Sequence, residues 1–224
     1  NEVYKSIKGH SLLEIIMQAN DNRINETEYS QPSLFMIQAG VVNILKSAGI
    51  VPNMVLGHSI GEIAAAYSSG ILDLNQAMTM ATIRGQLMQS LPKQGSMVVV
   101  FAEEAVIRDI ILGEQLISIA AINGPTSMVI SGDTERINAM VKIFQQRGLN
   151  CIPLNVSHAF HSPLMQPILA AFKQKICSIE FKNPHTQFIS TVPTILKPTE
   201  VDYWVHHISE CVNFKEGMLT IEKN

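Results

Sequence analysis

The sequence predicts an α/β fold in which a small subdomain is inserted into a larger one. The first observation is a short apolar run, Met54 to Leu56, followed by Gly57-His58-Ser59-Ile60-Gly61 and an alanine-rich helix to about Ser69. The second is the order β-α-β-β-α-β that is expected over about residues 95–155, which is the ferredoxin-like arrangement. We therefore predict a larger part made of residues 1–93 and 157–224 and a smaller part made of residues 94–156.

The strand, G-x-S-x-G turn and helix around Ser59 form the pattern of a nucleophile elbow. Glycines allow a sharp turn where a Cβ would clash. The turn would place Ser59 at a helix N-terminus, where free N–H groups and the helix dipole favour developing negative charge. The alternative interpretation is a serine in an ordinary glycine turn. The strand–turn–helix context favours the nucleophile.

Composition indicates a globular enzyme with a sizeable core. The 224 residues are 46% hydrophobic and 16% charged, and the net charge of −3 gives no reason to expect a nucleic acid or an anionic membrane as partner. The three cysteines are far apart in the sequence, without C-x-x-C spacing. This is typical of structural thiols in a reducing compartment, so we expect a cytoplasmic protein. No charge-free run of about 18 apolar residues and no signal peptide is visible.

Two helices are predicted on either side of the Ser59 turn. Residues 20–28 are expected to form a loop, and Gln31-Pro32 to begin a helix that Gly49 ends. Its apolar positions give it one apolar face, made of Leu34, Ile37, Val41, Val42 and Leu45.

The helix after the turn opens with a capping-box pattern, Asp73 with Gln76. Its apolar stripe includes Arg84, and a charge on such a stripe must be paired or must face a cleft. One interpretation is that the Arg84 side chain reaches the surface or pairs with a buried carboxylate. The other is that Arg84 is an anion receptor in a site.

The expected smaller part alternates strands and helices: strand Met97–Phe101, helix Glu103–Leu112, strands Leu116–Ile122 and Met128–Ser131, helix Asp133–Arg147 and strand Cys151–Leu154. The chain then carries His158 and His161 on a loop that enters a helix. No Asp or Glu accompanies them with metal-ligand spacing, so we do not expect a zinc site. A last strand, Phe188–Val192, and two closing helices, Asp202–Ser209 and Phe214–Glu222, complete the prediction.

Several motifs occur together and in order: Gln31-Pro32, Gly57-His-Ser-Ile-Gly-Glu62, Arg84-Gly-Gln-Leu-Met88, Asn123-Gly-Pro, His158-Ala-Phe-His161-Ser-Pro-Leu-Met165 and Tyr203-Trp204. In these motifs the sequence resembles the acyltransferase domain of a polyketide synthase, of the malonyl-CoA:acyl-carrier-protein transacylase family. The resemblance implies an α/β-hydrolase-like core with an inserted ferredoxin-like (βαββαβ) subdomain. It implies transfer of a malonyl unit from malonyl-CoA to the phosphopantetheine arm of an acyl carrier protein, beside neighbouring synthase domains, with no bound cofactor or metal.

The resemblance also assigns roles to individual residues. Ser59 matches the nucleophile, His161 the base, and Arg84 the arginine that pairs with the substrate carboxylate. Asn213 matches the position whose backbone carbonyl orients the histidine. Substrate-binding positions are implied for His58, Ile60, Phe160, His158 and Gln31. Phe160 in the His-Ala-Phe-His setting goes with malonyl rather than methylmalonyl units, because a phenyl ring beside the α-carbon leaves little room for a methyl branch.

One family feature is expected ahead of Asn1. Family members have there a glycine- and glutamine-rich strand and turn that supplies one oxyanion-hole donor, the other being the N–H of Ile60. Two alternative functions therefore stay open: a serine acyl-thioester hydrolase, and a truncated, non-catalytic scaffold domain of a multidomain synthase. Elbow hydrolases normally place an acidic residue between serine and histidine in the chain, and no clear candidate is visible in the larger part. The intact Ser59, Arg84 and His161 favour catalysis over a scaffold.

Overall fold

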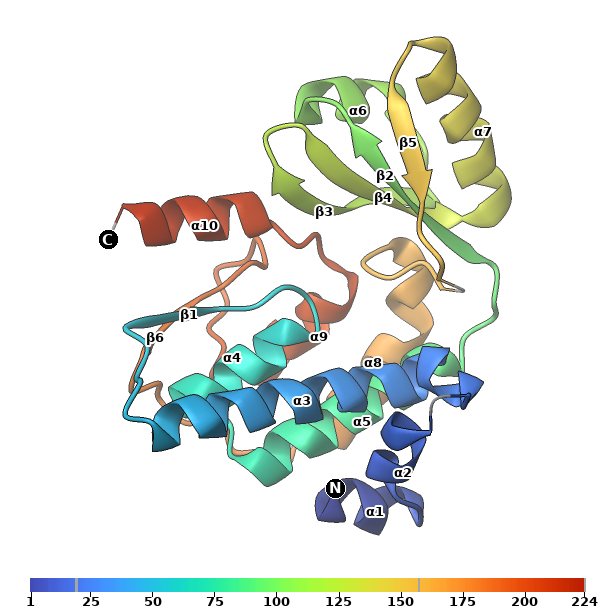
Figure 1. Cartoon of the computed structure of the whole chain (residues 1–224). Helices are drawn as coiled ribbons and strands as arrows, with labels where there is room; N and C mark the ends of the chain where they lie inside the picture. Colours follow the sequence, from blue (N-terminus) through green and yellow to red (C-terminus); the bar gives the residue numbers. More distant parts are fainter. Residues whose placement is uncertain (19, 157, 224) are drawn as a thin grey trace. The chain divides into compact units, whose positions relative to one another are not determined.

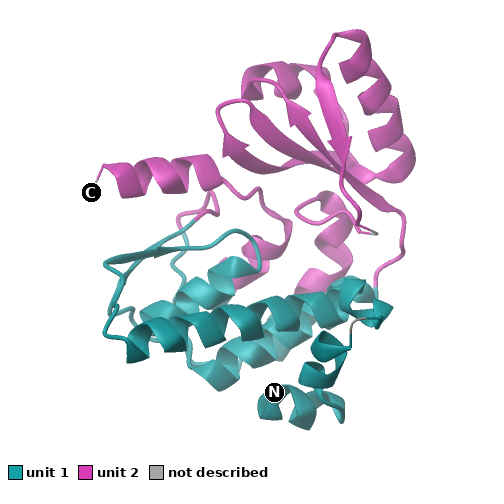
Figure 2. Cartoon of the chain, viewed as in Figure 1, with its two compact units in different colours: residues 1–90, 171–190, 196–201 teal, residues 91–170, 191–195, 202–224 magenta. Residues whose placement is uncertain are grey.

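The computed structural model describes residues 1–18, 20–156 and 158–223 (Figure 1). It divides into two units, which Figure 2 colours separately. The first holds residues 1–90, 171–190 and 196–201, and the second holds residues 91–170, 191–195 and 202–224. The fold is mixed α/β, as predicted, with a parallel strand pair in one unit and an antiparallel sheet in the other. The assignment of an α/β-hydrolase-like core and an inserted subdomain stays a prediction.

The first unit is mainly helical. Its elements are α1 (Glu2–Lys8), α2 (Leu12–Met17), the 3-10 helix η1 (Asn22–Asn25), α3 (Thr27–Ser47), β1 (Met54–Leu56), α4 (Gly61–Ser69), α5 (Leu74–Gln89) and β6 (Gln187–Ile189). Strands β1 and β6 pair in parallel, with Val55 opposite Phe188. Helix α3 packs against α4 and α5. The predicted capping box is confirmed, because Asp73 accepts from the Gln76 N–H and the Gln76 side chain accepts from the Asp73 N–H.

Helix α3 begins earlier than the sequence predicts. It starts at Thr27, so Pro32 lies inside the helix instead of at its start. The expected loop at residues 20–28 is therefore wrong in part, since η1 and the first residues of α3 occupy most of it. Because proline has no N–H, α3 lacks the hydrogen bond that this position would otherwise donate to the Glu28 carbonyl.

The apolar side of α3 is not the side that packs in the unit. Ile37 is 54% exposed and Val41 51% exposed, and Leu34 and Leu45 are exposed as well. The buried side chains are instead Gln31, Pro32, Ser33, Phe35 and Ala39. The apolar face is therefore not the side on which α4 and α5 pack in the described residues. Part of the apolar side lines a pocket of about 550 Å³ beside β1.

The second unit contains a four-stranded antiparallel sheet in the order β3-β4-β2-β5. The chain runs β2 (Gly95–Phe101), α6 (Glu104–Ile110), β3 (Ile117–Gly124), β4 (Ser127–Asp133), α7 (Thr134–Gln146) and β5 (Asn150–Pro153). This is the predicted β-α-β-β-α-β order. The 3-10 helix η2 (Pro163–Met165), helix α8 (Gln166–Ile176), which is divided between the units, α9 (Val201–Ser209) and α10 (Phe214–Glu222) complete the chain. Strand β6 is shorter than the Phe188–Val192 strand predicted.

The sheet of the second unit buries both faces. Alternate side chains of a strand point to opposite faces, and β2 follows this rule. Val98 and Val100 belong to a core with Ile107 of α6 and Phe144 of α7, the two helices that Figure 1 shows against this sheet. Met97 faces the other way, toward a second cluster that includes Val129 and Val212. Among the described residues, no helix is long and apolar enough to cross a membrane.

The two glycines of the G-x-S-x-G turn are predicted to respond differently to alanine. A Cβ at Gly57 would overlap the backbone atoms of Gly61 and Glu62, whereas a Cβ at Gly61 would meet only the Gln38 side chain, at 3.7 Å. Gly57→Ala is expected to lower the free energy of unfolding by about 1–3 kcal/mol, as overpacking does. Gly61→Ala, at the first residue of α4, should leave the free energy of unfolding unchanged or raise it by up to about 1 kcal/mol. Urea unfolding of both variants tests this, and equal losses would contradict the turn geometry.

Candidate functional site

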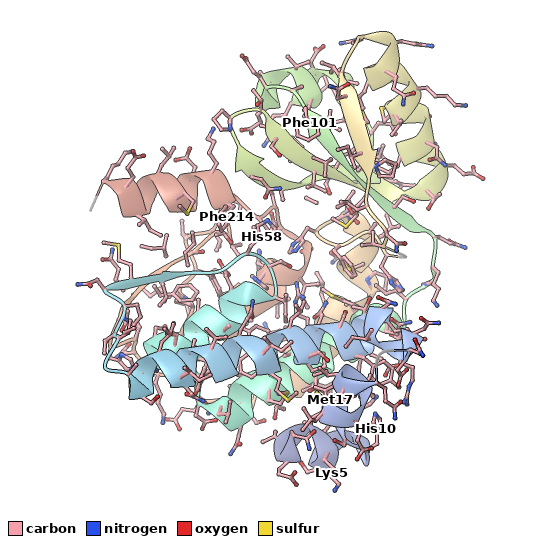
Figure 3. All side chains as sticks on the ribbon, in the orientation of Figure 1. Lys5, His10, Met17, His58, Phe101 and Phe214 are labelled. Carbon is pink, nitrogen blue, oxygen red and sulfur yellow. The ribbon has the colours of Figure 1, made fainter. Side chains whose placement is uncertain are left out.

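Ser59 lies in a strained turn between β1 and α4. Its φ is +50°, in the left-handed region that non-glycine residues rarely adopt. The turn is closed by two backbone hydrogen bonds, from the Gly61 N–H to the His58 carbonyl (2.9 Å) and from the Glu62 N–H to the Ser59 carbonyl (2.8 Å). Figure 3 labels His58, the exposed neighbour of the serine in this turn. The strand–turn–helix geometry predicted for residues 54–69 is therefore present.

Arg84 reaches Ser59 from helix α5. The side chain is only 1% exposed. Its Nη2 donates to the Ser59 Oγ at 3.1 Å, and its Nη1 donates to the Gln31 Oε1 at 2.8 Å. The Nε is also buried and has no hydrogen-bond acceptor among the described residues. This burial excludes the interpretation in which Arg84 reaches the surface, whereas a buried carboxylate, Glu62, does interact with its charge. The guanidinium lies beside the serine hydroxyl.

Burial lowers the pKa of Arg84 to about 10, while the charge of Glu62 acts in the opposite direction. Glu62 is fully buried on α4, three residues after Ser59. An arginine with a pKa of about 10 remains a cation at neutral pH, so the unit buries a positive charge whose fork is not filled. Such a charge is costly unless an anion accompanies it, and a guanidinium fits a carboxylate with two parallel hydrogen bonds. The arrangement is suited to bind an anion next to Ser59.

Gln31 holds the guanidinium from the side of α3. Its Oε1 accepts from Arg84, and its Nε2 contacts the Met88 Sδ at 3.0 Å. The side chain is buried. Both ends of the amide therefore contact α5 residues, which fixes the amide orientation and, through it, the position of Arg84.

His161 belongs to the second unit, on the loop before η2. It is 4% exposed and, like Ser59, has a positive φ, of 55°. These two are the non-glycine residues with positive φ in the part of the chain that the structure describes. Such backbone strain costs of order 1–3 kcal/mol and gathers at functional sites. The Ser118 hydroxyl donates to the His161 carbonyl at 2.8 Å and supports this conformation.

The imidazole of His161 is oriented by Glu210, not by Asn213. The His161 Nδ1 lies 2.9 Å from the backbone carbonyl of Glu210. A carbonyl only accepts, so Nδ1 carries a proton, and in the neutral imidazole Nε2 is the nitrogen with the lone pair. The prediction for Asn213 is wrong, because its carbonyl instead accepts from the Gly217 N–H in α10 (3.2 Å), the helix that its side chain caps. Helix α9 positions the Glu210 carbonyl. The Glu210 N–H donates to the His206 carbonyl and so continues the last turn of that helix.

His158 and Phe160 hold the same loop. The His158 Nε2 lies 3.1 Å from the Leu91 carbonyl, and burial is the main reason that the pKa of this buried histidine is lowered. Phe160 packs against the sheet face that includes Met97 and Ala121, with its ring centroid 6.1 Å from that of His158. The two side chains thus anchor the loop that carries His161. Their roles toward a substrate stay predictions.

The predicted site residues fall into two groups. Ser59, Arg84 and Gln31 are in contact in the first unit, where His58 is exposed and Ile60 half-buried. His161, His158 and Phe160 share one loop of the second unit. Sequence reasoning missed three contributors, namely Glu62, Ser118 and the Glu210 carbonyl. Within the described residues, no group of three or more His, Cys, Asp or Glu side chains is placed to hold a metal ion.

A strained serine in an elbow, a buried arginine on its hydroxyl and a carbonyl-oriented histidine define an α/β protein with the parts of a serine nucleophile site. Residues 1–224 match the family described as the acyl transferase domain. The chain therefore belongs to the acyl transferase domain family, as the motifs around Ser59, Arg84 and His161 predict.

Known relatives and solved structures agree with this assignment. Polyketide synthase GfsA of Streptomyces halstedii is 40% identical over 200 residues, which make up 87% of this chain and 3% of GfsA. The acyltransferase domain from the second module of the salinomycin polyketide synthase superposes with a TM-score of 0.93 at 35% identity, over 99% of this chain and 53% of that one. Malonyl CoA-acyl carrier protein transacylase of Coxiella burnetii has a TM-score of 0.90 at 26% identity, over 99% and 74%. The chain thus spans a small fraction of GfsA and about half of the salinomycin domain.

Removal of the buried guanidinium tests the anion site. Malonate is expected to raise the melting temperature of the wild type above that in sodium chloride of equal ionic strength, because a ligand of the folded state stabilises it. Arg84→Met should lose this rise. Arg23→Met, which removes an exposed arginine paired with Asp21, should keep it. Thermal unfolding followed by fluorescence is the measurement, and a malonate effect that persists in Arg84→Met would show that the anion binds elsewhere.

Proposed function

We propose that the chain is the acyltransferase domain of a polyketide or fatty-acid-type synthase. In this role it loads a malonyl extender unit onto an acyl carrier protein through an ester on Ser59. The observation that carries the proposal is the hydrogen bond from the buried Arg84 guanidinium to the Ser59 hydroxyl. This hydrogen bond places a receptor for a free carboxylate next to a nucleophile. A substrate whose acyl group ends in a carboxylate requires both groups, whereas a neutral ester requires only the nucleophile.

In the first half-reaction, the Ser59 Oγ attacks the thioester carbonyl of malonyl-CoA. His161 Nε2 takes the hydroxyl proton, since a serine needs a base within hydrogen-bond reach to be nucleophilic at neutral pH. The C–S bond then breaks, and His161 returns the proton to the leaving thiolate, giving free coenzyme A. The N–H of Ile60, at the start of α4, is the proposed donor to the oxyanion.

In the second half-reaction, the phosphopantetheine thiol of the carrier protein replaces coenzyme A. His161 takes the thiol proton, the thiolate attacks the Ser59 ester, and the alkoxide that leaves recovers the proton. Ser59 is regenerated and the malonyl thioester is now on the carrier. Coenzyme A and phosphopantetheine are substrates in this scheme, and no bound cofactor takes part.

Arg84 supplies the selection for a dicarboxylic acyl unit. The malonyl carboxylate would accept hydrogen bonds from the guanidinium, which keeps its charge when desolvated. In the structure, the Ser59 hydroxyl accepts a hydrogen bond from the Arg84 Nη2. Substrate binding would therefore exchange a hydroxyl acceptor for a charged one, and charge-assisted hydrogen bonds are about twice as strong as neutral ones. An acetyl group offers no such exchange.

The partners follow from the relatives. GfsA is named a polyketide synthase, and the Coxiella burnetii structure is named a malonyl CoA-acyl carrier protein transacylase. These names support a coenzyme A thioester as donor, an acyl carrier protein as acceptor and other synthase domains as neighbours of this one.

Covalent labelling tests the nucleophile and the base. On incubation with malonyl-CoA, the wild type is expected to gain the mass of one malonyl group and Ser59→Ala none, because only the hydroxyl forms the ester. His161→Ala should slow acylation by about 10²–10⁴, and His158→Ala much less. Intact-mass spectrometry and an assay for free malonate give the readout. Release of malonate without lasting label would indicate the hydrolase, and no reaction at all the non-catalytic scaffold.

Phe160 is the proposed determinant for malonyl over methylmalonyl. It packs on the sheet face of the second unit in the loop of His161, and a phenyl ring beside the substrate α-carbon would exclude a methyl branch. Ile60, next to the nucleophile, adds apolar bulk. Discrimination by one methyl group is worth only about 1–3 kcal/mol, or roughly 10–200-fold. A preference is therefore expected, not complete exclusion.

A matched pair of phenylalanines tests this preference. Phe160→Ser is expected to raise methylmalonyl relative to malonyl labelling of Ser59 by about 10-fold or more when the two thioesters compete. Phe214→Ser is the control, because Phe214 packs against the same apolar cluster (Figure 3) but lies outside the His161 loop. Mass spectrometry separates the two acyl-enzymes. An unchanged ratio in Phe160→Ser, or an equal change in both variants, would remove Phe160 from the selection.

A further inference from the structure

A second histidine lies against the imidazole of His161. His207 of α9 is 1% exposed, and its ring centroid is 6.2 Å from that of His161, with an angle of 88° between the ring planes. This is the edge-to-face geometry that aromatic rings prefer. His206, its neighbour on the helix, is exposed instead. The two consecutive histidines therefore have different surroundings.

His207 is itself held by the interior of the second unit. Its ring centroid is 5.5 Å from that of Trp204, which is in turn 5.1 Å from Tyr203. Both of these aromatic residues are fully buried or nearly so. The ring that contacts His161 is thus fixed by close packing and does not rearrange without disturbing α9.

Two contacts act on different parts of the His161 imidazole. The Glu210 carbonyl locates its Nδ1, and a hydrogen bond tolerates a range of angles. The His207 ring packs against the same imidazole and narrows the range of directions that its Nε2 can take. Helix α9 provides both contacts, the Glu210 carbonyl just past its last residue and the His207 ring one turn earlier.

We propose that His207 is a positioning residue that fixes the ring plane of His161, and so the direction of its Nε2 lone pair, through their edge-to-face contact. The inference rests on the proposed function of His161 as the base for Ser59. It assigns His207 no proton transfer. The property required at position 207 is an aromatic ring of this size, not an ionisable group.

Four variants of α9 test the proposal. His207→Ala removes the ring, His207→Phe keeps a ring without nitrogen atoms, His207→Leu keeps apolar volume without a ring, and His206→Ala is the exposed control. The acylation rate of Ser59 is measured against malonyl-CoA concentration by intact mass. The labelling rate by a fluorophosphonate, which reports the activated serine whatever its acyl preference, is measured alongside, with Ser59→Ala as the blank.

His207→Ala is expected to lower the limiting acylation rate by about 10–100-fold, since misplacing a reacting group by about 1 Å costs up to about 10², and to change KM by less than about twofold because no substrate contact is lost. His207→Phe should restore the rate to within about threefold, and His206→Ala should equal the wild type. If His207→Ala does not fold, a lower rate in His207→Leu than in His207→Phe supports the proposal.

Two results would overturn it: a wild-type rate in a folded His207→Ala, or equal rates in His207→Leu and His207→Phe. A wild type that reacts with the fluorophosphonate but not with malonyl-CoA overturns the proposed function only, and the labelling rates of the same variants then decide the role of His207. A wild type that does not react with either reagent overturns both.

Discussion

The placement of one buried positive charge is the strongest constraint on the first unit. Arg84 contacts Gln31 of α3 and Ser59 of the turn, so a single guanidinium connects α5 to two other segments. Burying such a group is costly, and the lowered pKa reflects that cost. Glu62 offsets part of it without filling the fork, whose Nε has no acceptor among the described residues. A charge that is kept buried and incompletely paired lowers stability, which is expected at a binding site and not in a structural ion pair.

Backbone strain marks the same two residues that the motifs single out. Ser59 and His161 adopt positive φ, and in each case the surrounding contacts maintain the conformation. At Ser59 these are the backbone hydrogen bonds of the turn and the small Gly57, which leaves room for the start of α4. At His161 they are the Ser118 hydroxyl and the Glu210 carbonyl. Neither conformation follows from the propensity of serine or histidine, so each depends on tertiary structure.

Sequence reasoning predicted the local patterns and missed what depends on distant segments. The elbow, the capping box at Asp73 and the β-α-β-β-α-β order follow from short-range rules, and the structure contains them. The packed side of α3 did not follow, because periodicity identifies an apolar face but not the elements that cover it. The resemblance assigns the orientation of His161 to Asn213 and the structure to Glu210, because any residue can supply a backbone carbonyl and its identity carries no signal. Glu62 was visible in the motif, yet its burial beside Arg84 depends on how α4 packs on α5.

The carbonyl on His161 also bears on the proposed chemistry. Hydrolases with an elbow serine usually orient the histidine with a carboxylate, whereas here the last turn of α9 presents a neutral acceptor at the negative end of a helix dipole. A helix end stabilises a cation by roughly 0.3–1 kcal/mol, less than the charge-assisted hydrogen bond of a carboxylate does. Transfer to a thiol needs less help from the base than hydrolysis does, because a thiol gives up its proton far more readily than water, with a pKa near 8.5 for the thiol of cysteine. A histidine that is well oriented but modestly stabilised as a cation suits reversible transfer between thiols. In the proposed reaction, the orientation that α9 gives to His161 through Glu210 and His207 therefore matters more than the electrostatic effect of the helix.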